Sequence, residues 1–151
     1  MNALNERSPF YKNILNTLLT ARGIKGWLAI GLLFFAIDLC WLGLVAQPIY
    51  ADLLGDLKAP EPYWPAAIAF YLFYITTIFG YGVVNALSFR DAFTRGASLG
   101  FVAYATYELT NWAVIRDWPA LLVPMDILWG VVLTSTVAGL GYRLLNPKGD
   151  L

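Results

Sequence analysis

Residues 26–47 read GWLAIGLLFFAIDLCWLGLVAQ, a run of 22 residues in which Asp38 carries the only formal charge. An α-helix rises 1.5 Å per residue, so about 20 apolar residues cross the ~30 Å hydrocarbon core of a bilayer. The run does not alternate between apolar and polar residues, as a strand of a membrane barrel does. This stretch therefore predicts a transmembrane helix.

Three more apolar stretches of similar length follow, at residues 64–87, 96–115 and 120–142. In lipid the backbone polar groups find no water, so only helices and closed barrels span the membrane. The whole chain is 59% hydrophobic and only 13% charged, whereas soluble domains are about a quarter charged. We predict an all-α integral membrane protein whose residues 26–143 form a bundle of four transmembrane helices.

The segments outside the spans have a different character. Prolines, glycine and charges predict connecting loops at 47–63, 88–95 and 116–119. Within residues 1–25, apolar positions 11, 14, 15, 18 and 19 share one helical face, which predicts an amphipathic helix on the cytoplasmic membrane surface. Residues 144–151 would form a cytoplasmic tail.

Lysine and arginine are distributed unequally between the two sides of the predicted bundle. Eight lie on the side of the termini: Arg7, Lys12, Arg22, Lys25, Arg90, Arg95, Arg143 and Lys148. Only Lys58 and Arg116 lie on the other side. Positively charged loops stay in the cytoplasm, so both termini are expected there.

Composition also excludes several kinds of site. The chain has no histidine and one cysteine, Cys40, which excludes an internal disulfide and a cysteine-based zinc site. Its formal net charge is zero, and no basic surface suggests nucleic acid as a partner. No cofactor motif is present.

Three acidic residues fall inside the predicted spans: Asp38, Glu108 and Asp126. An ionised acid in a bilayer costs several kcal/mol, so such residues suggest a functional site. Counted from the span ends, all three lie roughly 10–14 Å below the outer boundary at 1.5 Å per residue. We expect them to form one site.

Polar side chains on two spans support this site. Positions 104, 107, 108 and 111 share one face of the third span, and the second span carries a similar stripe. The expected ligand- or cation-binding residues are Asp38, Glu108, Asp126, Asn111, Tyr104, Tyr107, Tyr71 and Tyr74, supported by Trp41, Trp129, Asn85 and Arg116. Trp41 and Trp129 each follow an acid by three residues, so the first and fourth spans share a short, weak sequence similarity. Structural packing is the simpler interpretation of both tryptophans.

The acids have alternative explanations. A protonated carboxyl can join helices through a hydrogen bond without any further function. Carboxylates, amides and phenols can also ligate Mg²⁺, Ca²⁺ or Mn²⁺. If a metal binds, its ligands would be Asp38, Glu108 and Asp126.

Five segments resemble an uncharacterised bacterial membrane protein family, domain of unknown function 2177. They are DLCWLG (38–43), FYLFY (70–74), FVAYATYELTN (101–111), RDWP (116–119) and DILWG (126–130), within residues 27–143. The acid in the third segment is usually Asp in the family, whereas this chain has Glu108. The resemblance implies a small four-helix protein of the bacterial inner membrane and no established activity.

These features favour a pocket that opens toward the periplasm and binds or transports a proton, a cation or a small amphiphile. A second hypothesis is a membrane-embedded enzyme of lipid or isoprenoid metabolism, in which a carboxyl acts as general acid. A third is an accessory or assembly subunit of a larger membrane complex, in which the acids would pair with a partner's basic residue. The sequence does not decide between a homodimer and such a complex.

Overall fold

The computed structural model describes residues 10–146, and these are almost entirely helical, without a β-strand. The α-helices are α1 (Phe10–Leu18), α2 (Ala21–Trp41), α3 (Gln47–Leu54), α4 (Trp64–Thr77), α5 (Phe89–Val114) and α6 (Leu122–Leu145). A π-helical segment, Leu42–Ala46, joins α2 to α3, and another, Ile78–Val84, extends α4. A 3₁₀ turn, Gly55–Leu57, follows α3. The predicted all-α class is confirmed.

Three helical stretches in residues 10–146 are long and apolar enough to cross a membrane: Ala21–Leu54, Trp64–Val84 and Leu122–Leu145. They correspond to the first, second and fourth predicted spans, with boundaries that differ by a few residues. The third predicted span lies within α5, which has 26 residues but is not among these stretches. Its polar residues, among them Glu108 and Asn111, lower its hydropathy.

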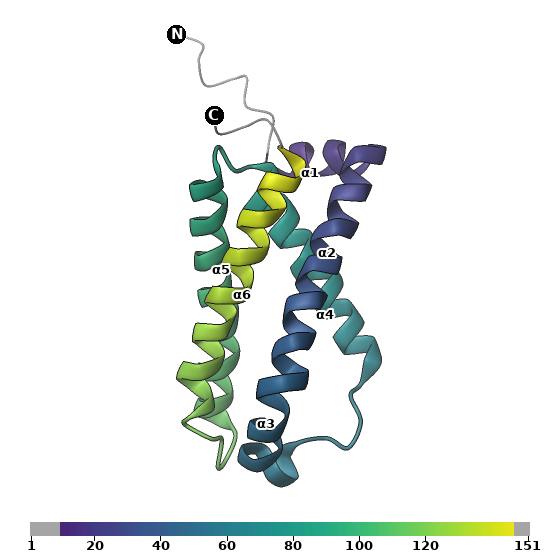
Figure 1. The fold of residues 1–151 in the computed structure, drawn as a ribbon. Coiled ribbons are helices and arrows are strands. Elements are labelled where there is room, and N and C mark those ends of the chain that lie inside the picture. The colour runs from purple at the N-terminus through teal and green to yellow at the C-terminus, as the bar shows by residue number, and fades with distance from the viewer. Residues whose placement is uncertain (1–9, 147–151) are drawn as a thin grey trace.

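The long helices α2, α4, α5 and α6 lie side by side (Figure 1). Helix α1 lies at the end of the bundle where α2 begins and α6 ends, and α3 lies at the opposite end (Figure 1). The predicted N-terminal helix is therefore present as α1. Residues 21–25 of that segment already belong to α2, whereas its residues 1–9 and the tail residues 147–151 lie outside the described residues.

The structure corrects two of the predicted loops. The segment 47–63 begins with helix α3, in which Pro48 is the second residue and follows directly on the π-helical segment Leu42–Ala46. The charged segment 88–95 forms the first two turns of α5, because the Ser88 hydroxyl caps the helix by accepting from the Asp91 N–H at 3.1 Å. The Asp91 carboxylate accepts from Arg95 Nε and from the Leu87 N–H, each at 2.9 Å. These contacts lower the pKa of Asp91.

Helices α5 and α6 form the most extensive contact in the described bundle. Small residues let their backbones approach: a Cβ atom added to Gly96 would lie 2.5 Å from the Thr134 carbonyl oxygen and 2.8 Å from Ala138 Cβ. Beside this contact, fully buried apolar side chains from three segments fill the core: Phe34, Phe79, Leu133 and Val137. The position of α5 therefore depends on glycine, as in many membrane helix pairs.

Replacing Gly96 by Ala should destabilise the bundle by about 1–3 kcal/mol, the usual cost of overpacking. The matched control is Gly43→Ala, because a Cβ atom at Gly43 meets no other atom within 4 Å. Thermal unfolding of the detergent-solubilised proteins measures both effects. Equal melting temperatures for the two variants would contradict the close α5–α6 packing.

Candidate functional site

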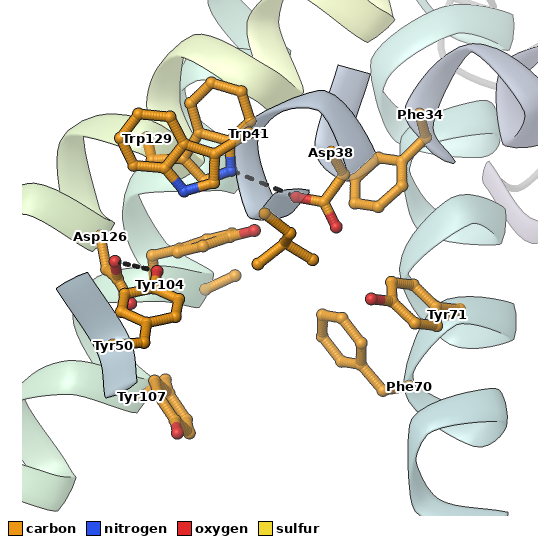
Figure 2. A pocket seen from close by; sticks show the side chains of 12 residues that line it. Phe34, Asp38, Trp41, Tyr50, Phe70, Tyr71, Tyr104, Tyr107, Asp126 and Trp129 are labelled. Carbon is orange, nitrogen blue, oxygen red and sulfur yellow. Dashed lines mark hydrogen bonds between the residues drawn. The ribbon is translucent and has the colours of Figure 1, made fainter. Parts of the chain in front are cut away.

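A cavity of about 400 Å³ lies between α2, α4, α5 and α6, with α3 at its edge. Twelve residues line it: Phe34, Asp38, Trp41, Leu42, Tyr50, Phe70, Tyr71, Ala103, Tyr104, Tyr107, Asp126 and Trp129. Figure 2 shows their side chains around the open space. Because α3 contributes Tyr50, the cavity lies toward the end of the bundle opposite α1.

Asp38 and Trp129 connect α2 to α6 at this cavity. The Trp129 indole N–H donates to Asp38 Oδ1 at 3.2 Å, and Asp38 is buried. Trp41 and Trp129 stack, with ring centroids 4.5 Å apart and planes 11° apart. The two Asp-x-x-Trp segments therefore meet across the bundle, although their sequence similarity alone was weak. Both tryptophans line the cavity.

Asp126 has a partner that the sequence analysis missed. The Tyr50 hydroxyl donates a hydrogen bond to Asp126 Oδ1 (Figure 2). Tyr50 lies in α3, within the segment predicted to be a loop. One feature of the sequence could have indicated this helix: no helix-breaking residue lies between Pro48 and Gly55. A proline in the first turn is compatible with a helix.

Glu108 lies behind the cavity and is fully buried. Its Oε2 accepts from the Trp118 indole N–H at 2.9 Å, while Oε1 has no hydrogen-bond partner. The Glu108 and Asp126 carboxyls are close enough to interact electrostatically, but Glu108 is not part of the cavity lining. The sequence analysis did not include Trp118 among the site residues, and the structure gives its indole this buried acceptor.

The three acids therefore do not meet as one cluster. Glu108 and Asp126 are neighbours, whereas Asp38 lies on the other side of the stacked indoles from Asp126 (Figure 2). No group of three Asp, Glu, Cys or His side chains in residues 10–146 is placed to hold a metal ion. Of the three expected acids, Asp38 and Asp126 line the cavity, and Glu108 lies outside its lining.

The expected tyrosines divide in a similar way. Tyr71, Tyr104 and Tyr107 line the cavity, and the Tyr71 hydroxyl points into it (Figure 2). Tyr74 does not line the cavity, because its hydroxyl is hydrogen-bonded to Thr134 Oγ1 at 2.8 Å in the core. Phe70 stacks on Tyr74 with ring centroids 5.3 Å apart and presents its own ring to the cavity.

The remaining expected residues lie away from the cavity. Asn111 is half-buried beside Tyr107 and does not line the cavity. Asn85 donates to the Gly80 carbonyl at 2.6 Å and closes the π-helical segment after α4, at the opposite end of the bundle. Arg116 is exposed and is not part of the lining. Neither Asn85 nor Arg116 therefore contributes to the cavity lining.

The chemistry of the lining is acidic and aromatic. It contains two carboxyls and eight aromatic rings but no lysine or arginine. Phenyl, phenol and indole faces attract cations through their quadrupoles. The cavity therefore suits a positively charged group and disfavours an anion.

The Trp118–Glu108 hydrogen bond can be tested by removing its donor. Trp118→Phe should lower the unfolding free energy by about 1–3 kcal/mol, because the buried carboxyl then loses the indole N–H that donates to its Oε2. Trp112→Phe is the matched control, since Trp112 is 52% exposed. Adding Glu108→Met to Trp118→Phe should recover part of the loss. Thermal unfolding provides the measurement, and indistinguishable single variants would disprove the role of this bond.

Residues 23–143 match the family model described as predicted membrane protein (DUF2177). No curated protein and no solved structure gives a significant match. Because the family model covers most of the chain, including every residue of the cavity lining, this protein belongs to the DUF2177 family of predicted membrane proteins.

Proposed function

We propose that this protein is a four-span protein of the bacterial inner membrane that binds the positively charged group of a small organic cation or amphiphile. The site is the cavity between α2, α4, α5 and α6. Both termini lie in the cytoplasm, so the cavity is in the periplasmic half of the bundle. Binding is the first step of either transport or sensing of such a molecule.

The composition of the cavity lining carries this proposal. Asp38 and Asp126 supply negative charge, and eight aromatic rings surround the space without a neutralising cation. Aromatic cages of this kind recognise quaternary ammonium groups. A pocket of about 400 Å³ lies within the ordinary range for small-molecule sites, about 300–1,000 Å³.

The same observations favour an organic cation over a metal ion or a proton. A divalent metal requires several oxygen ligands at about 2.0–2.6 Å, and the described residues form no three-residue acidic cluster. A proton site needs a titratable group but no cavity of this size. A molecule with an apolar body uses both the rings and the carboxyls.

The location of α5 supports four spans. It packs along α6 over much of its length, and its polar face contributes Tyr104 and Tyr107 to the cavity. A polar stripe directed into a bundle is compatible with a membrane span, since polar side chains in membranes face the protein interior. The eight cations on the side of the termini support the cytoplasmic orientation.

Choline and its neutral isostere 3,3-dimethyl-1-butanol provide a matched pair of probes, because they differ in charge and hardly in shape. Choline should bind to the protein in nanodiscs, and the neutral isostere should not. Asp38→Asn and Asp126→Asn should each weaken choline binding about tenfold or more, equivalent to ~1.4 kcal/mol. Isothermal titration calorimetry measures all affinities.

Glu61→Gln is the control for this experiment, because Glu61 is an exposed acid in the loop before α4. It should bind choline as the unaltered protein does. Equal binding of the two probes, or unchanged choline binding by both Asp variants, would refute the proposed cation site. Either result would favour the enzyme or subunit hypotheses.

The proposed topology makes a separate prediction. A fluorescent protein fused after residue 146 should fold and fluoresce, and alkaline phosphatase fused there should be inactive, because both report a cytoplasmic location. Alkaline phosphatase inserted between Lys58 and Glu61 should be active in the periplasm. Phosphatase activity at both positions would mean an even number of spans between them, so that α4, α5 and α6 could not all cross the membrane.

A further inference from the structure

A second hollow lies between α2 and α6, at the end of the bundle away from the cation cavity. It measures about 460 Å³. Arg22 and Lys25 line its outer end, and Ala29 and Ile30 continue it along α2. Counted along α2, Arg22 to Ile30 covers about 12 Å at 1.5 Å per residue. The hollow is therefore a groove with a cationic mouth and an apolar floor.

No acid in residues 10–146 neutralises the two cations at this mouth. Arg22 is exposed, and its Nη2 donates to the Leu145 carbonyl oxygen at 2.5 Å, which holds the guanidinium beside the last turn of α6. Lys25 is exposed one turn further along α2. No acid lines the groove, and the ion pair found in residues 10–146 is Arg95–Asp91, which is elsewhere.

Glycines form part of the groove. A Cβ atom added to Gly26 would lie 2.5 Å from the Leu145 side chain, and one added to Gly141 would lie 2.9 Å from Ile30. At both positions a side chain of the other helix packs directly against the glycine backbone. The open space beside them is lined by short or aliphatic side chains, which suits a hydrocarbon chain.

We propose that this groove binds an anionic phospholipid of the cytoplasmic leaflet, with its phosphate at Arg22 and Lys25 and one acyl chain along Ala29 and Ile30. Charge complementarity identifies the occupant. The cytoplasmic leaflet is negative, and cations near its surface attract anionic lipids. The groove reaches from the predicted headgroup level into the hydrocarbon, so headgroup and chain are bound together. This proposal does not depend on the cation cavity.

Native mass spectrometry can test the selectivity. The full chain is released from mixed micelles that contain equal amounts of phosphatidylglycerol and phosphatidylcholine with identical acyl chains. The protein should retain phosphatidylglycerol preferentially. Lys25→Gln should reduce this preference about fivefold, the effect expected for one cation near a phosphate, and Arg22→Gln/Lys25→Gln should reduce it further.

Two controls separate the groove from general charge effects. Lys58→Gln/Arg116→Gln removes the same charge from the other end of the bundle and should leave the preference unchanged. Ala29→Phe keeps both cations but fills the groove, and it should lower phosphatidylglycerol retention. Lys25→Gln has no hydrogen-bond partner to lose among the described contacts, so it remains informative if the double variant fails to fold.

The proposal is overturned if Lys25→Gln keeps the full preference, or if the Lys58/Arg116 double variant loses as much. It is also overturned if Ala29→Phe retains phosphatidylglycerol normally, because the chain would then not occupy the groove. Binding of soluble glycerol phosphate without any lipid preference would identify a phosphate site and not a lipid site.

Discussion

The carboxyls inside this protein depend on indole and phenol donors from other parts of the chain. Asp38 accepts from Trp129, Asp126 from Tyr50, and Glu108 from Trp118. Burying a polar group without a hydrogen-bond partner costs free energy, because the group loses its hydrogen bonds to water. Each acid therefore requires a specific neighbour, and these neighbours fix how α2, α3 and α6 approach each other. The stacked Trp41 and Trp129 rings reinforce the same contact.

The two π-helical segments have different positions relative to the cavity. Leu42–Ala46 lies between Asp38 and Tyr50 on one continuous helical stretch, and a π-helical turn changes the direction of the side chains that follow it. Through this change Tyr50 reaches Asp126 on α6. The segment Ile78–Val84 lies at the other end of the bundle, where Asn85 closes it. Of the two π-helical segments, only Leu42–Ala46 is therefore next to the cavity.

The long α2 stretch has different chemistry at its two ends. Near its start, Arg22 and Lys25 offer positive charge beside an apolar groove. Further along, Asp38 offers a carboxyl in an aromatic cavity. The charges have opposite signs because the two places face different surroundings: an anionic leaflet in the proposed orientation, and a partly open aromatic cavity.

The sequence by itself determined that the chain is helical and belongs in a membrane. Long apolar runs leave no other way to satisfy the backbone in lipid, so the helix class needs no tertiary information. The sequence also indicated acids and tyrosines inside the spans, because such residues are rare in a bilayer and can be counted directly. Of these, Asp38, Asp126, Tyr71, Tyr104 and Tyr107 line the cavity.

Only the tertiary structure decided which of these side chains meet. The sequence analysis grouped Glu108 with the other acids because all three lie at a similar depth in their helices. The rotation of a helix about its axis decides which side chains face the cavity, and Glu108 is buried outside the cavity lining. Tyr50 was missed because a proline- and glycine-bearing segment resembles a loop, while its contact with Asp126 joins residues 76 positions apart. Depth follows from counting residues. Rotation and long-range pairing follow from packing between helices, which no single stretch of sequence contains.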